Sequence, residues 1–148
     1  MKKIDIIIYS LSIKLLREEK KFLTKFKKMN RGIDKWKKQK MLIIKKLNRD
    51  FGPLPAKAFP GRASILINTL GLNEKNISYI SEQPGSKKIG HYVPGTRIPI
   101  VSDNKFLRNS KINVIINFVW HIEKEIKNYL EIIKCSSKIL NIISKKDY

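Results

Sequence analysis

The sequence is poor in several residue types, and each scarcity narrows what the chain can be. It contains one cysteine, Cys135, which cannot form an internal disulfide, so we expect a reducing, cytoplasmic setting. The two histidines and the cysteine lack the spacing of zinc ligands, and we predict no metal site. No serine lies in a nucleophile-elbow context. The sequence therefore predicts neither a disulfide-stapled domain, nor a zinc domain, nor a serine hydrolase.

Long apolar runs are also missing. The segment 4–16 is apolar, but Asp5 and Lys14 interrupt it well short of the roughly 20 residues that a membrane span requires. The charged residues 17–21 follow it without a small-residue cleavage site. We therefore expect neither a membrane span nor a signal peptide.

Acidic residues are scarce, with 12 against 32 basic ones and a net charge of +20. Such a charge invites a nucleic-acid interpretation, because lysine and arginine neutralise phosphates. The charge is spread along the chain, however: residues 1–50 carry 17 basic and 5 acidic side chains, and residues 51–148 carry 15 and 7. We interpret it as a solvated, lysine-rich surface and expect no specific nucleic-acid partner.

Glycine and proline are nearly absent from the first 50 residues, which contain one glycine and no proline. Apolar residues recur there at helical intervals and predict two lysine-rich amphipathic helices separated near residues 30–32. The aromatic residues Phe22, Phe26 and Trp36 have spacings that fit a buried stripe. We predict a helical extension over residues 1–50 and a separate domain over residues 51–148.

Short apolar runs bounded by turn residues alternate with helical patterns after residue 50. This alternation predicts right-handed crossovers and a small, three-layer α/β domain with a parallel, Rossmann-like sheet. Residues 113–119 are rich in β-branched residues and predict a central strand. The other predicted elements are an extended piece near 51–58, a helix over 63–70, strands at 77–81 and 97–102, a helix over 121–134 and a last strand within 138–143.

Three loops follow predicted strands, and ligands of open α/β sheets bind at that carboxyl edge. In the first loop, Gly61 permits close backbone approach and Arg62 can pair with a phosphate, although a simple strand-to-helix turn fits the same residues. In the second, His91 and Tyr92 can serve a ligand as acid, base or donor, or can pin their own loop. In the third, His121 caps a helix or faces a ligand, and we favour capping.

These loops together resemble the C-terminal domain of the sugar-nucleotide C-methyltransferases. The resemblance rests on "PGRASILINTLGL", "YISEQPGSKKIGHYVPGTRIPIVS" and "VWHIEKEI", covers about residues 51–133, and is strongest in "GHYVPGTRIPIV". It implies a Rossmann-like domain that packs against an S-adenosylmethionine-binding domain, with a nucleotide-sugar in the cleft between them. In that family a base and the methyl-donor site lie on the S-adenosylmethionine domain, and the C-terminal domain mainly holds the nucleotide-sugar.

The resemblance implies a substrate-binding role for eleven residues and a catalytic role for none. The 148 residues leave no room for a methyl-donor domain and contain no G-x-G-x-G motif. We therefore expect that this chain alone binds no cofactor. Either it works with a separate S-adenosylmethionine-binding methyltransferase subunit as its partner, or it is a non-catalytic remnant. The alternatives are a basic nucleic-acid-binding module and a membrane-surface module. The eleven residues are Gly61, Arg62, Ala63, Ser64, Gln83, His91, Tyr92, Gly95, Thr96, Trp120 and His121.

Overall fold

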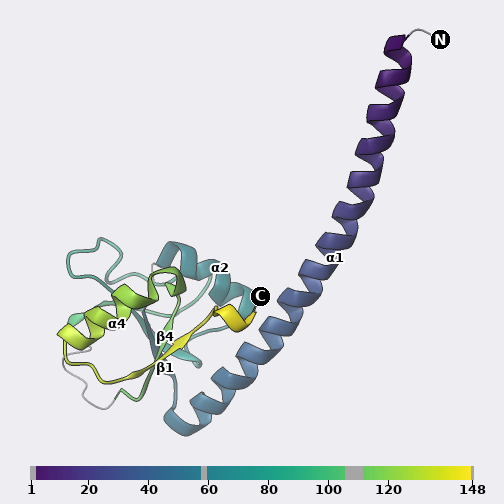
Figure 1. Cartoon of the computed structure of the whole chain (residues 1–148). Coiled ribbons are helices and arrows are strands. Elements are labelled where there is room, and N and C mark those ends of the chain that lie inside the picture. The colour runs from purple at the N-terminus through teal and green to yellow at the C-terminus, as the bar shows by residue number, and fades with distance from the viewer. Residues whose placement is uncertain (1–2, 58–59, 106–111, 148) are drawn as a thin grey trace. The chain divides into compact units, whose positions relative to one another are not determined.

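A computed structural model describes residues 3–57, 60–105 and 112–147 of the chain (Figure 1). The chain divides into two units, Met1–Trp36 and Lys37–Tyr148, and each is described by itself. Helix α1 (Lys3–Phe51) supplies the first unit and the opening helix of the second. The second unit contains all five strands, the helices α2 (Pro60–Leu70) and α4 (Glu123–Ile132), and the 3-10 helices η1 (Trp120–Ile122) and η2 (Lys145–Asp147).

Helix α1 is continuous over 49 residues, so the prediction of two helices separated near residues 30–32 is wrong. A single glycine inside a helix costs only about 1 kcal/mol relative to alanine. The residues around Gly32 are mostly good helix formers, and no proline interrupts them. The helix ends where Gly52 takes a positive φ of 73° and donates its N–H to the carbonyl of Asn48 at 2.9 Å.

In the first unit, two aromatic residues of α1 contact each other. The ring centroids of Phe22 and Phe26 lie 6.4 Å apart, and both side chains are exposed. The unit by itself therefore does not bury the aromatic stripe that the spacing predicts. No helix in the described ranges combines the length and apolar character needed to cross a membrane.

Five parallel strands form one sheet in the second unit, which confirms the predicted α/β class. Their order is β3-β2-β1-β4-β5, and every adjacent pair is parallel. The predicted run at 113–119 forms β4, an interior strand with every residue buried, while β1 takes the central position. The strands are β1 (Leu54–Lys57), β2 (Ile77–Glu82), β3 (Ile100–Ser102), β4 (Val114–Asn117) and β5 (Lys138–Asn141).

The two faces of the sheet bury different helices. On one face, Ile126 and Leu130 of α4 pack in one cluster with Tyr79 of β2 and Ile115 of β4. The β1–α2–β2 and β4–α4–β5 crossovers proceed in opposite directions along the sheet, so right-handed connections place α2 on the other face. This handedness gives a three-layer arrangement, and the carboxyl ends of all strands lie at one edge because every strand is parallel.

A buried ion pair ties the second half of α1 to the C-terminal segment. Lys40 Nζ lies 2.9 Å from Asp147 Oδ2, and both side chains are less than a tenth exposed. Burial opposes ionisation of Asp147, but hydrogen bonds from Lys40 and Ser144 outweigh it, and the pKa of Asp147 is lowered. The charged pair is therefore the form that the fold stabilises.

We expect Asp147→Asn to lower the free energy of unfolding at pH 7 by about 3 kcal/mol, because it leaves the buried Lys40 ammonium with the carbonyl of Asn141 but without an opposite charge. Since the folded pKa of Asp147 lies below its usual value of 3.8, the stabilisation is present above that value and is lost as the pH falls through the folded pKa. Urea unfolding measured from pH 7 down through the acid range should show a difference in unfolding free energy between wild type and variant that is full above pH 3.8 and shrinks as the pH falls below it. A difference that stays equal across this range would contradict the assignment.

Candidate functional site

Every strand of the sheet ends in a polar residue. These residues are Lys57, Glu82, Ser102, Asn117 and Asn141, and they lie at one edge because all five strands are parallel. At that edge the chain leaves β1 toward β2 and leaves β4 toward β5, in opposite directions along the sheet. Such a switch point is where open α/β sheets bind their ligands. The carboxyl edge is therefore the candidate site.

Lys57, at the end of β1, forms a buried ion pair with Asp103, the residue that follows β3. Lys57 Nζ lies 2.6 Å from Asp103 Oδ1, and the side chains are 7% and 1% exposed. The same ammonium lies 5.1 Å from the ring centroid of Tyr129 in α4. Burial, and then a hydrogen bond to Asp103, raise the pKa of Tyr129, so its hydroxyl stays protonated as a donor. This group joins β1, β3 and α4 beneath the edge.

Asn117 shapes the turn that follows β4. Its Nδ2 donates to Asn141 Oδ1 at 2.8 Å, and its Oδ1 accepts from the N–H of Val119 at 2.9 Å. The backbone N–H of Phe118 donates to the carbonyl of Lys57, which continues the pairing with β1 by one bond. These bonds fix the chain immediately before Trp120.

The start of helix α2 offers the features of an anion site. Its first turn holds no acidic residue, and the N–H groups of a first turn have no partners within the helix. Gly61 and Arg62 are exposed, and an added Cβ at Gly61 would meet nothing within 4 Å. The hydroxyl of Ser64 donates to the carbonyl of Gly61 at 2.7 Å, while Ala63 is buried. Of these four residues, Gly61 and Arg62 are the exposed ones.

The loop between β2 and β3 is folded onto itself and onto α2. Asn68 of α2 donates through Nδ2 to the carbonyl of Pro94 at 3.0 Å. The hydroxyl of Thr96 donates to the carbonyl of Val93 at 2.9 Å and accepts from the N–H of Ile98 at 3.1 Å. Thr96 therefore holds the turn together, a role that the sequence did not indicate.

The side chains predicted to serve a ligand from this loop point outward. His91 and Tyr92 are exposed, and so is Gln83 at the start of the loop. Their backbone is fixed, because the N–H of Ile100 donates to the carbonyl of His91 at 2.8 Å. The loop thus presents His91 and Tyr92 on an ordered frame and does not bury them.

The third loop forms the short helix η1, which contains Trp120 and His121. Their rings meet edge to face with centroids 5.5 Å apart, and His121 is exposed. The N-cap residue of α4 is Ile122, and no side-chain hydrogen bond caps the helix. The expectation that His121 caps α4 is therefore wrong, because the 3-10 turn moves the start of α4 beyond its reach.

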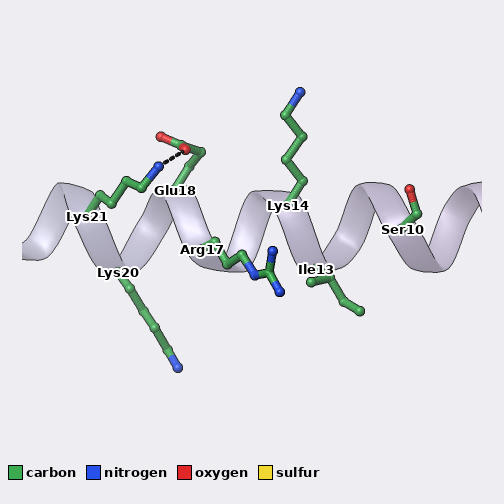
Figure 2. Close-up of a pocket in the computed structure, with 7 residues that line it drawn as sticks. All are labelled: Ser10, Ile13, Lys14, Arg17, Glu18, Lys20 and Lys21. Carbon is green, nitrogen blue, oxygen red and sulfur yellow. Dashed lines mark hydrogen bonds and ion pairs between the residues drawn. The ribbon is translucent and has the colours of Figure 1, made fainter.

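A surface hollow along the first unit is not a comparable site. It is lined by seven residues of α1 between Ser10 and Lys21. Figure 2 shows that Lys14 and Lys20 leave the helix on opposite sides, and that Lys21 and Glu18 are joined by an ion pair. Groups on a single helix cannot enclose a ligand. Within the described ranges, no three histidine, cysteine or acidic side chains cluster as metal ligands.

All eleven predicted site residues lie on segments that follow the carboxyl ends of β1, β2 and β4. What sequence reasoning missed is the polar layer beneath these loops: Lys57, Ser81, Glu82, Asp103 and Asn117. The available signal was a polar residue at the end of each apolar strand run. Their pairing was not visible, because Lys57 and Asp103 are 46 residues apart.

Comparison with known proteins identifies the family of the chain. Residues 12–141 match the family model described as the C-methyltransferase C-terminal domain. No curated protein matches the chain. The match includes most of α1 as well as the whole sheet, and so extends further toward the N-terminus than the resemblance over 51–133. The chain belongs to the family of C-methyltransferase C-terminal domains.

Proposed function

We propose that this domain holds a nucleotide-sugar at the carboxyl edge of its sheet while a separately encoded methyl-donor domain methylates a sugar carbon. The observation that carries the proposal is the switch point between β1 and β4, beside a helix start with an exposed arginine and no acidic residue. A diphosphate fits such a start, because the helix dipole, free N–H groups and a guanidinium all favour negative charge.

The loop after β2 supports the same ligand. Residues 83–102 contain Lys87, Lys88 and Arg97 and no acidic residue. All three basic side chains are exposed, so the loop adds positive and no negative charge to this edge of the sheet. His91 and Tyr92 add an imidazole and a phenol that can hydrogen-bond to the sugar or the base. We assign these groups to binding and orientation.

S-adenosylmethionine, bound on the partner domain, would supply the methyl group. In the proposed arrangement this chain fixes the diphosphate at Gly61 and Arg62, and Trp120 and His121 border the sugar from the far side of the switch point. Lys57 and Asp103 form a buried ion pair with each other. We therefore assign them a structural role beneath the site, and we do not assign them the removal of a proton from the sugar. The proton beside the keto group would leave to a base of the partner domain.

The direct test is titration calorimetry of the full chain with uridine and guanosine diphosphate-sugars and a thymidine diphosphate-sugar. Arg62→Ala is expected to weaken binding roughly tenfold or more, because it removes a charge-assisted contact to phosphate. Arg49→Ala, in the last turn of α1, is the matched control with the same loss of charge. The proposal is contradicted if the chain binds none of these nucleotide-sugars, or if Arg62→Ala and Arg49→Ala lose equal affinity.

A further inference from the structure

The part of α1 within the first unit exposes a stripe of apolar side chains. Within the described residues this unit is a single helix, so these side chains have no second element to pack against. Steps of four, three and four residues separate them, which places them on one face of the helix. We call residues 20–36 the amphipathic segment. The side chains of its stripe, each at least 40% exposed, are Phe22, Phe26, Met29 and Ile33.

Basic side chains occupy most of the remaining surface of the amphipathic segment. It carries seven basic side chains and one acidic one, a net charge of +6. Each residue turns the helix by about 100°, so Lys20, Lys27 and Arg31 lie on the side away from the stripe. By the same rotation, Lys25 and Lys35 border the stripe on its two sides, and all five of these side chains are exposed. The segment therefore offers a partner an apolar face bordered by positive charge.

Two kinds of partner fit this combination poorly. A second copy of the segment would cover the stripe, but it would bring another net charge of +6 against the first. A nucleic acid would contact the basic side and leave the stripe in water, because single-strand binders interleave aromatic and basic residues on one face. Phe22 and Phe26 lie on the face that holds no basic residue.

The surface of an anionic bilayer fits both features at once. A helix with a lysine-rich polar face and phenylalanine on its apolar face lies in the plane of the membrane interface. Its apolar stripe enters the boundary between headgroups and acyl chains, and basic residues near an anionic surface are attracted to it. Lysines at the borders of the stripe suit this position, since their apolar stems lie along the boundary while their ammonium groups reach the phosphates.

We propose that the amphipathic segment docks on the surface of an anionic phospholipid membrane, with Phe22 and Phe26 below the headgroups and the basic side chains among the phosphates. The segment makes about five helical turns and is about 25 Å long, enough to lie along the interface. The site goes beyond the proposed function, because it lies on the first unit and nucleotide-sugar binding is assigned to the second.

The experiment is sedimentation of the full chain with vesicles of phosphatidylserine and phosphatidylcholine in about a 1:3 ratio, and with vesicles of phosphatidylcholine alone. We expect the partition constant to be roughly a hundredfold larger for the anionic vesicles, and to fall as salt is raised. Phe22→Ser combined with Phe26→Ser should weaken binding to anionic vesicles roughly tenfold or more, because it removes apolar area and keeps the charge. The matched control, Ile65→Ser with Ile132→Ser, removes two exposed apolar side chains from α2 and α4 and should change binding less than about twofold.

Every outcome bears on the proposal. Equal binding to the two kinds of vesicle, or binding to neither, overturns it. Equal binding by wild type and the phenylalanine variant also overturns it, because attraction between charges would then suffice. A wild-type dimer that the phenylalanine variant dissociates, with no binding to vesicles, would assign the stripe to a second copy. If the variant does not fold, the comparison of the two kinds of vesicle on the unaltered chain still decides.

Discussion

Replacing Asp103 by alanine is expected to destabilise the second unit by about 4 kcal/mol, a large share of the 5–15 kcal/mol that keeps a domain folded. The variant leaves the Lys57 ammonium buried without its partner and removes the acceptor of the Tyr129 hydroxyl. Urea unfolding followed by circular dichroism measures the loss directly. We expect the transition to move to lower urea with an unchanged slope.

A double variant separates loss of the charge pair from loss of packing. Lys57→Met combined with Asp103→Leu removes both charges and keeps apolar volume, and buried pairs replaced in this way are often neutral in stability. We expect it to be more stable than Asp103→Ala alone. An Asp103→Ala variant that loses less than about 1 kcal/mol would contradict the description of this pair as buried and mutually dependent.

Gly95→Ala is expected to cost about 3 kcal/mol of stability, because two penalties act at one position. Gly95 has a φ of 79°, and an added Cβ would lie 2.7 Å from Asn68 Oδ1. Asn68 would have to rotate away and give up its hydrogen bonds to the carbonyls of Ser64 and Pro94. Thermal and urea unfolding measure the effect.

Gly90→Ala is the matched control for this prediction. Gly90 has a similar φ of 88°, but an added Cβ there would meet nothing within 4 Å. We expect it to lose only the backbone term, about 1 kcal/mol. If the two variants were equally stable, the contact between Asn68 and the loop would contribute nothing measurable.

The strands and the two helices of the sheet domain were predictable because their signals are local. Strands β2 and β4 are short apolar runs bounded by turn residues, and α4 carries an apolar stripe at helical spacing. Gly71, with a φ of 68°, ends α2 where the sequence places the stop. Alternation of these elements then leaves few topologies besides a parallel sheet with right-handed crossovers.

The errors and omissions have physical causes of two kinds. A break near Gly32 would require the helix penalty of one glycine to outweigh the cooperativity of a long helix. Helix α1 is continuous through Gly32, so the penalty is too small. The contacts beneath the site depend on three-dimensional proximity: Asn68 meets Pro94 across 26 positions, and Asn117 meets Asn141 across 24. A single sequence carries the residue types for such contacts but does not say which ones meet.

The polar residues at the strand ends also bear on how the sheet finds its alignment during folding. A strand that slides by one residue exchanges its two faces, and a purely apolar strand such as the first three residues of β4 discriminates poorly between such alignments. Asn117 pairs with Asn141 across β4 and β5, and their amides bond when both strands stop together. A slipped strand would draw an amide or a charge into an apolar layer. The polar residues at the strand ends thus destabilise folding intermediates in which a strand is out of register. Without them, the apolar strands could pair in several registers.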